Sequence, residues 1–417
     1  MTEQTATAHE AATTPDNRGP LAGLRVIEYG EFISAPYCAK LMANLGAEVI
    51  KIETPNGDKA RRFGPFPDDV PHPEKSGLFL NLNTDKLGVT LNVDTATGRS
   101  IFNQLIVEAD MLIENNPPCR MEELGFDFAS LHEVNPRLIV TSITPFGWTG
   151  PYRDYKGHAI QAVAGSGIAH RTGQPDRSPL TTPLSQGDYQ GAIHGAAATM
   201  SAFFGRKVTG EGQHVDISTM ECMGTLTGGA GILNVLFGTG AEPRRAGHRV
   251  TAYYPWTVLP CQDGYVEVIT MQDRHWDSFL EAMGNPEWGR DPRFQDKFAM
   301  VQHADELDAN IIPWLMERDR RSLWQEFRER RISYQPVHDL GEVIESDHMR
   351  ERGFFQEVEH PAAGTLKYPG APFKLSASPW QIRCPAPLLG EHNELIYTCR
   401  LGFDRTDLVK LRQASII

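Results

Sequence analysis

Strand-like and helix-like segments alternate through the first 150 residues, and this alternation limits the possible folds more than any other feature. The apolar run 24–29 is typical of a buried strand, residues 38–45 have helical spacing, and residues 46–52 form a second strand-like run. A strand, a helix and a strand within about 30 residues indicate a βαβ unit with parallel strands.

The same pattern recurs further along the chain. Segments with helical character are followed by short apolar runs of strand type. They are a helix over 98–109, a strand over 110–114, a helix over 121–133, a strand over 138–143, a helix rich in small residues over 188–204 and a strand over 215–217. The repeated order predicts a doubly wound α/β architecture. The glycine fingerprints of nicotinamide-binding sites and of P-loops are absent from the sequence.

The length of 417 residues predicts two or three domains. We expect residues 1–19 to be a disordered tail. A loop near 240–255, rich in Gly, Arg, Tyr and Pro, is a candidate linker, and a helix is expected over 220–236 before it. Residues 240–345, with a strand at 264–270 and charged helices after it, predict a smaller α+β domain.

Composition argues against several classes of partner. The formal net charge of −13 makes nucleic acid and anionic membranes poor partners. No apolar run reaches the roughly 18 residues that span a bilayer, and the N-terminus does not resemble a secretory signal, so we expect a cytoplasmic protein. The six cysteines form no CxxC pair, and no metal site is expected.

Asp188 is the first candidate catalytic residue, because it lies close to two glycines at a predicted junction between a loop and a helix. The positive end of a helix stabilises a carboxylate, which favours an exposed nucleophile or base. The alternative is an ordinary helix N-cap. His158, at the start of a small apolar segment, is either a proton-transfer group or a hydrogen-bonded structural residue.

Four basic residues lie near the ends of predicted strands in the first half of the chain: Lys51, Arg61, Arg62 and Lys86. In open α/β sheets, ligands bind beyond the carboxyl ends of the strands, so these side chains are candidate anion contacts. The alternative is that they are solvated surface charges.

Several ordered segments together resemble the class III CoA-transferases, the family of formyl-CoA transferase, carnitine CoA-transferase and α-methylacyl-CoA racemase. The resemblance spans about residues 20–405. The segments that carry it are PLAGLRV (20–26), LGAEVIKIE (45–53), ADMLIEN (109–115), NPRLI (135–139), FGWTGPY (146–152), GEGQHVD (210–216) and APLLGEH (386–392).

The resemblance implies a large Rossmann-like domain built from both chain ends, residues 20–239 together with 346–417. It also implies an inserted small domain and a homodimer of two interlocked chains. It places the family's catalytic aspartate at Asp188 and implies coenzyme A as the substrate carrier, without a metal. It also implies CoA contacts at Phe32, Ile33 and Ser34, at Asn83 with Lys86, and at Asn115 and Asn116. Transfer of CoA from an acyl-CoA to a carboxylic acid would then pass through an aspartyl anhydride and an aspartyl-CoA thioester.

Racemisation is the alternative within this family, with Asp188 and His158 moving a proton at the acyl α-carbon. His158 matches the racemase position, although the next residue is Ala159 in place of the usual acid. Thr54 and Pro117 replace residues of two usual basic segments, so Arg61, Lys86 or Arg120 are candidate substitutes for the phosphate contacts. The loop 247–254 lacks the glycine-rich pattern of formyl-CoA transferase, which favours an acid bulkier or more apolar than formate or oxalate.

Overall fold

The computed structural model describes residues 19–226, 232–238 and 244–417. The described residues divide into two compact units. The first lies within 1–168, 182–229 and 350–417, and the second within 169–181 and 230–349. The expected tail over 1–18 and the expected domain boundary at 239/240 lie outside the described residues.

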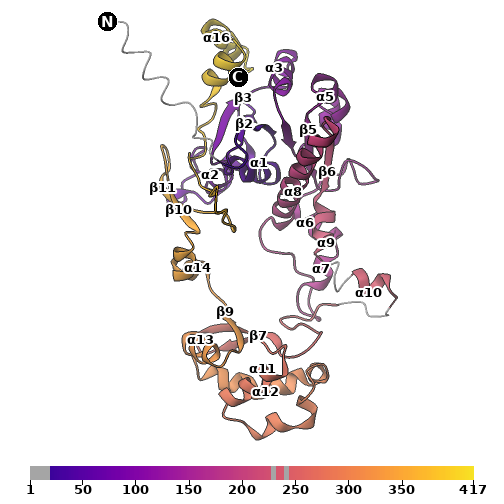
Figure 1. Cartoon of the computed structure of the whole chain (residues 1–417), viewed down its shortest axis with the longest axis vertical. Helices are drawn as coiled ribbons and strands as arrows, with labels where there is room; N and C mark the ends of the chain where they lie inside the picture. The colour runs from indigo at the N-terminus through magenta and orange to yellow at the C-terminus, as the bar shows by residue number, and fades with distance from the viewer. Residues whose placement is uncertain (1–18, 227–231, 239–243) are drawn as a thin grey trace. The chain divides into compact units, whose positions relative to one another are not determined.

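A six-stranded parallel sheet forms the centre of the first unit (Figure 1). Its strands are β1 (Arg25–Tyr29), β2 (Glu48–Glu53), β3 (Lys86–Thr90), β4 (Met111–Glu114), β5 (Ile139–Thr144) and β6 (His214–Ser218). Their order in the sheet is β3-β2-β1-β4-β5-β6, so the direction of winding reverses between β1 and β4. The predicted α/β fold with a parallel sheet is confirmed.

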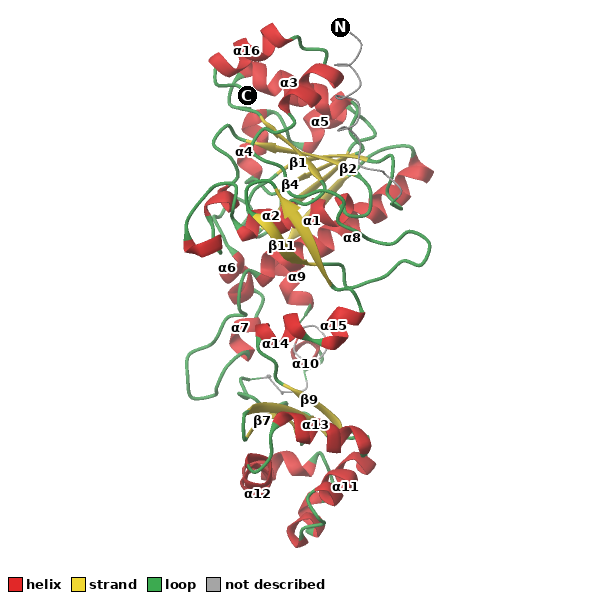
Figure 2. Cartoon of the chain, turned by 90° about the vertical axis from the view of Figure 1, so that its left-hand side faces the viewer, coloured by secondary structure: helices red, strands yellow, loops and turns green. Residues whose placement is uncertain are grey.

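Helices cover both faces of this sheet, as Figure 2 shows for its yellow strands and the red helices around them. On one face, Val26 and Val49 pack with side chains of α1 (Ser34–Ala43) and α8 (Gln186–Thr209). On the other, Ile27 and Ile50 pack with α3 (Ala96–Val107), α5 (Phe128–Val134) and α16 (Arg405–Gln413). Neighbouring strand residues point to opposite faces, and burial of both faces explains the continuous apolar runs.

Residues near the C-terminus cover the edge strand β3. The sequence analysis did not predict this strand. The Thr90 N–H donates to Asn393 at 2.8 Å, and the Tyr397 hydroxyl donates to the Thr90 carbonyl at 2.7 Å. Gly88 lies so close to Pro387 that an added Cβ would be 2.8 Å from its Cγ. The returning segment therefore protects polar groups that an edge strand would otherwise expose.

Two predicted helices differ from the structure. The helix over 121–133 is two helices, α4 (Pro118–Leu124) and α5, because Gly125 adopts a left-handed φ of 71° and ends the first of them. The predicted helix over 220–236 is described as α9 (Thr219–Thr225) and α10 (Leu233–Leu236), and residues 227–231 between them lie outside the described part.

An antiparallel sheet forms the core of the second unit with three helices packed against it. The strands are β7 (Trp256–Cys261), β8 (Gly264–Ile269) and β9 (Ser333–Pro336), and the helices are α11 (Asp273–Ala282), α12 (Ala304–Met316) and α13 (Arg320–Glu329). Val266 and Val268 alternate into the core and are fully buried, as expected for a strand with one buried face.

The shorter elements complete the description. They are α2 (Gly77–Leu82), α6 (Ala159–Gly165), α7 (Ile168–Arg171), α14 (Leu340–Glu345), α15 (Asp347–Glu351), the hairpin of β10 (Phe355–His360) and β11 (Gly364–Pro369), the 3-10 turns Lys59–Arg62, Pro67–Asp69, Glu287–Arg290, Pro292–Phe294 and Ala299–His303, and a π-helical turn Leu395–Arg400. Among the described residues, no helix is both long and apolar enough to cross a membrane.

Small residues of α8 let the helix backbone approach β5 and α9. An added Cβ at Gly191 would lie 2.5 Å from the Thr219 Cγ2 atom and 3.0 Å from the Ile143 Cγ2 atom. At Gly195 it would lie 2.9 Å from the Ile143 Cδ1 atom. Tight packing, the bland interpretation of this small-residue helix, is confirmed at both positions.

Substitution of Gly191 by Ala is expected to lower the free energy of unfolding by about 1–3 kcal/mol, because the new methyl group overlaps Thr219. Gly205, on the same helix, has only the Gln213 side chain near its Cβ direction, at 3.8 Å. Gly205→Ala should therefore raise stability by up to about 1 kcal/mol through helix propensity. Urea denaturation of both variants measures the contrast, and equal effects would contradict the packing explanation.

Candidate active site

The loops that follow β1 and β4 meet where the winding of the sheet reverses, the usual ligand position in open α/β sheets. Residues 30–34 follow β1, and Asn115 and Asn116 follow β4. The structure therefore brings together two of the predicted CoA-contact segments, Phe32–Ser34 and Asn115–Asn116, at the carboxyl edge of the sheet.

Asn115 and Asn116 tie these two loops together. The Glu31 N–H donates to Asn115 Oδ1 at 2.9 Å, and Asn115 Nδ2 donates to the Glu31 carbonyl at 2.8 Å and to the Ser34 hydroxyl at 2.9 Å. Asn116 Nδ2 donates to the Tyr29 carbonyl at 2.8 Å. These amide groups fix the path of the backbone, as local polar side chains do in loops.

Phe32 holds an unusual backbone conformation in the first of these loops. Its φ is 68°, in the left-handed region that residues other than glycine rarely adopt. The Phe32 N–H donates to Asp58 Oδ1 at 2.9 Å, and its ring makes an edge contact with Phe63 at a centroid distance of 4.8 Å. Such a conformation persists only when its surroundings hold it, and Asp58 supplies one restraint.

A buried ion-pair network lies beneath this loop, centred on Lys51. Lys51 Nζ is 2.7 Å from Glu28 Oε1 and 2.8 Å from Asp58 Oδ2, and it donates to the Gly30 carbonyl at 3.1 Å. Burial alone would lower the pKa of Lys51, but the two carboxylates raise it, so the ammonium stays charged. The fully buried Lys51 thereby joins β1, β2 and the loop that carries Phe32.

Lys86 and Asn83 extend the network toward β3. Lys86 Nζ is 2.6 Å from Glu28 Oε2 and donates to Asn83 Oδ1 at 2.8 Å and to the Pro36 carbonyl at 2.7 Å. Burial lowers the pKa of Lys86 to about 8, against the opposing effect of Glu28. Asn83 is itself fully buried and donates to the Phe79 carbonyl at 2.9 Å.

Arg61 is equally buried and bound to carboxylates. Its guanidinium donates to both oxygens of Glu53, at 2.7 Å and 2.8 Å, and to Glu74 at 2.6 Å. It also lies 3.7 Å from the centroid of the Phe79 ring. The interpretation of Lys51, Arg61 and Lys86 as solvated surface charges is wrong, because their charges are neutralised inside the unit; Arg62 alone is exposed.

Asp188 lies at the opposite end of α8 from β6. Because β6 is parallel to β5, α8 runs back across the sheet and its first turn lies at the carboxyl edge. Ser185 occupies the N-cap position and Asp188 is the third helical residue, so the N-cap interpretation of Asp188 is wrong. Among the described residues, no donor forms a hydrogen bond with its carboxylate, which is therefore available for chemistry.

The surroundings of Asp188 favour its neutral form more than water does. Burial raises the pKa of Asp188 to about 6, while the nearby charge of His158 acts in the opposite direction. Perturbed carboxylates of this kind are typical of functional sites.

His158 is brought next to Asp188 by a close approach of two helix starts. It is the N-cap residue of α6, and its N–H donates to Gln161 Oε1 at 2.9 Å. An added Cβ at Gly187 would lie 3.4 Å from the Ala159 Cα atom, so the residues that precede Asp188 and follow His158 are in contact. The His158 side chain is exposed and can reach a bound molecule.

A ring contact connects Asp188 to the β1 loop. Tyr189, the residue after Asp188, makes an edge contact with Tyr37 of α1 at a centroid distance of 5.0 Å. Helix α1 begins at Ser34, where the loop that carries Phe32 ends. The two groups of candidate residues therefore lie on neighbouring elements of the same unit.

Sequence reasoning missed Glu28 and Asp58, which hold the buried cations. Strand register pairs Glu28 with Lys51, so a correct alignment of β1 with β2 is the signal that could have found the first of them. Asp58 lies in the loop before a 3-10 turn, where it accepts the Ala60 N–H at 2.7 Å, and nothing in its sequence surroundings distinguishes it from an ordinary turn residue.

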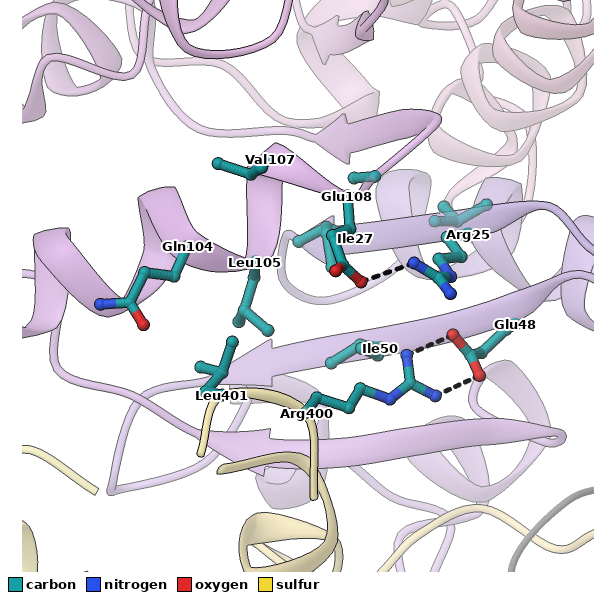
Figure 3. A pocket seen from close by; sticks show the side chains of 12 residues that line it. Arg25, Ile27, Glu48, Ile50, Gln104, Leu105, Val107, Glu108, Arg400 and Leu401 are labelled. Atoms are coloured by element: carbon teal, nitrogen blue, oxygen red, sulfur yellow. Dashed lines mark hydrogen bonds and ion pairs between the residues drawn. The ribbon is translucent and has the colours of Figure 1, made fainter. Parts of the chain in front are cut away.

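A cavity of about 200 Å³ lies at the other edge of the sheet and includes none of the candidate residues. Figure 3 shows Arg25 paired with Glu108, and Arg400 paired with Glu48, beside apolar side chains such as Ile50. These strand residues are at the amino ends of β1 and β2, away from the loops described above. No group of three potential metal ligands occurs among the described residues.

Substitution of Lys51 by Met is expected to lower the free energy of unfolding by about 3–5 kcal/mol, because it leaves Glu28 and Asp58 buried without their cation. The matched control is Lys59→Met, which removes an exposed pair with Glu31 and should change stability little. Urea denaturation compares the two variants, and similar values would contradict the role assigned to Lys51.

Substitution of Asp188 by Asn should stabilise the protein above pH 6. The folded pKa of about 6 exceeds the ordinary value of 3.8, so ionised Asp188 costs stability that is absent below pH 4 and complete above pH 6. With partial exposure considered, the gain is on the order of 1–2 kcal/mol at pH 7.5. Urea denaturation at pH 4 and pH 7.5 measures it, and a gain that did not grow with pH would contradict the assigned shift.

Comparison with known proteins gives consistent relatives over nearly the whole chain. A succinyl-CoA–D-citramalate CoA-transferase of Chloroflexus aurantiacus is 32% identical over 400 residues, which cover 95% of this chain and 98% of that protein. A formyl-CoA:oxalate CoA-transferase of Streptomyces coelicolor is 30% identical over 422 residues, with 95% and 99% covered.

Structural comparison agrees with this result. The crystal structure of a CAIB/BAIF family protein from Brucella suis superposes with a TM-score of 0.82 at 28% identity, and the match covers 91% of this chain and 99% of that one. The sequence model of the family described as CoA-transferase family III matches residues 21–393 of this chain. As the sequence motifs indicated, the chain belongs to CoA-transferase family III and is an enzyme that transfers CoA.

Proposed function

We propose that the protein moves CoA from an acyl-CoA to a carboxylic acid through covalent intermediates on Asp188. The observation that carries this proposal is the partly buried Asp188 carboxylate, which has no hydrogen-bonding donor among the described residues and lies in the first turn of α8. A carboxylate with few water contacts is a stronger nucleophile than one in bulk water, and with a pKa of about 6 it is still mostly ionised at pH 7.5.

The first half of the reaction loads CoA onto the enzyme. An Asp188 oxygen attacks the donor thioester carbonyl, the carbon–sulfur bond breaks, and CoA thiolate leaves a mixed anhydride behind. The thiolate then attacks the aspartyl carbonyl of this anhydride. The donor acid departs with the bridging oxygen, and an aspartyl-CoA thioester remains.

The second half delivers CoA to the acceptor. A carboxylate oxygen of the acceptor attacks the aspartyl thioester, CoA thiolate leaves again, and a second anhydride forms. Attack of the thiolate on the acceptor carbonyl yields the new acyl-CoA and restores the Asp188 carboxylate. No external proton donor is required, because every leaving group is a thiolate or a carboxylate.

Each attack produces a tetrahedral oxyanion that needs hydrogen-bond donors. The N–H groups of Gln186 and Gly187, at the start of α8, make no hydrogen bond among the described residues. We assign them as donors to these oxyanions, since the first amides of a helix have no partner within it and face anions favourably.

We place CoA against Phe32, Ile33 and Ser34 and against Asn115 and Asn116, which are close together at the switch point of the sheet. For Lys51, Arg61, Asn83 and Lys86, the buried contacts support a role beneath the bound CoA rather than at its phosphates. Each of these side chains holds the surrounding backbone or a carboxylate in place.

His158 keeps proton transfer at an acyl α-carbon open as the alternative, since it is exposed beside Asp188. The named relatives are CoA-transferases acting on D-citramalate, L-malate or oxalate, which favours transfer. The loop 247–254 lacks the glycine-rich pattern of formyl-CoA transferase, so we propose an acceptor acid that is bulkier or more apolar than formate or oxalate.

We also propose that two chains form an interlocked homodimer and that the protein is cytoplasmic.

Incubation with succinyl-CoA followed by hydroxylamine should convert Asp188 to its hydroxamate, because both anhydride and thioester react with this amine. Peptide mass spectrometry locates the product. Asp188→Ala should abolish it, whereas Asp154→Ala, at an exposed carboxylate of the same unit, should not.

The racemase alternative predicts the opposite pattern. No hydroxamate would form with any donor, and a 2-methylacyl-CoA in deuterium oxide would gain deuterium at its α-carbon in a reaction that depends on His158 and Asp188. That combination would overturn the proposed transfer.

A further inference from the structure

A hollow lined by aromatic and basic side chains lies in the second unit, and its lining contains none of the residues assigned to CoA transfer. Its volume is about 460 Å³, and its lining includes His275 of α11, Trp324 and Arg328 of α13, Arg331 after that helix, and Tyr334 of β9. None of the residues that line it is acidic. The hollow is therefore basic in a chain whose net charge is −13.

Its two arginines differ from three others on or beside the same helix. Arg318, Arg320 and Arg330 each lie within ion-pair distance of at least one carboxylate. Arg328 and Arg331 have no such partner within the part of the chain that the structure describes. Their guanidinium groups are therefore free to bind an anion, for which arginine offers paired donors.

Arg331 occupies a backbone position that suits glycine. Its φ is 56°, its N–H donates to the Arg328 carbonyl at 3.2 Å, and the Ile332 N–H donates to the Phe327 carbonyl at 2.9 Å. This is the usual pattern just past a helix C-terminus, where glycine avoids the strain of a left-handed residue. An arginine here places its charge beside the hollow at a cost in backbone energy.

His275 and Trp324 provide further recognition groups. The Nδ1 atom of His275 is buried and has no hydrogen-bond partner. Burial, with a contribution from Arg274, lowers the pKa of His275, which favours the neutral imidazole at this end of the hollow. Trp324 is 40% exposed, and the Arg328 guanidinium lies 5.2 Å from its ring centroid.

We propose that this hollow is a binding site for a small anion with two negative charges, carried by a phosphate or by two carboxylates. Arg328 and Arg331 bind the charges, and Trp324 packs against the rest of the ligand. Its lining residues belong to the second unit and Asp188 to the first. The proposal does not depend on the transfer reaction, so it stands whether or not the proposed function is correct.

Isothermal titration calorimetry of the full-length protein tests the proposal, and no acyl-CoA is added, so that the heat reports binding alone. The two probes are adenosine monophosphate, a phosphate ester with a planar base, and succinate, a dicarboxylate. We expect saturable binding of at least one of them. A response that depends on Arg328 and Arg331 and occurs with the nucleotide alone identifies a phosphate ligand, and one that occurs with succinate alone identifies a dicarboxylate.

Arg328→Gln together with Arg331→Gly should weaken this binding at least about tenfold, because two charge-assisted contacts are lost. Arg321→Gln, on α13 but not in the lining of the hollow, should bind as before. Arg331→Gly alone should weaken binding without lowering the melting temperature, since glycine suits its φ. The absence of saturable binding, or unchanged affinity in the double variant, would overturn the proposal.

Discussion

The Lys51 ammonium, enclosed by Glu28, Asp58 and the Gly30 carbonyl, is the interaction on which the candidate active site depends most. A charge removed from water in this way is stable only with its partners in place, so the ion pairs force β1, β2 and the loop after β1 into one arrangement. That arrangement supports the left-handed backbone of Phe32 through Asp58. The network thus holds the loop after β1 in one conformation at the point where the strand order of the sheet reverses. A substrate of the size of a cofactor is expected to bind there.

Asp188 illustrates the opposite use of burial. Lys51 is buried with compensating charges, whereas Asp188 is partly buried with only a nearby histidine. The raised pKa of Asp188 reflects the free energy lost when its charged carboxylate is removed from water. A carboxylate held at such a cost is suited to forming a covalent bond, in which its charge disappears. The small residues of α8 contribute by letting its backbone lie close to β5, which places the first turn of the helix at the carboxyl edge.

The parallel sheet was predictable because β1, β2, β4 and β5 are buried on both faces and read as apolar runs. Strand β3 was not predicted, since its five residues include a lysine and a glycine, and its burial depends on residues near 390. The family motifs singled out Asp188, yet the burial of Lys51, Arg61 and Lys86 was not predicted. Local sequence cannot show that a cation is enclosed by carboxylates from other elements. The strand register would have revealed only the pair of Glu28 with Lys51.

Transfer of an oxygen atom to Asp188 is the most direct test of the covalent account. The enzyme would be supplied with succinyl-CoA and succinate labelled with oxygen-18 in its carboxylates, and the peptide that contains Asp188 would be analysed by mass spectrometry. The proposed route leaves an acceptor oxygen on Asp188 each time the second anhydride is resolved, so label should accumulate there during turnover. Exchange of labelled succinate into succinyl-CoA without label at Asp188 would contradict the account.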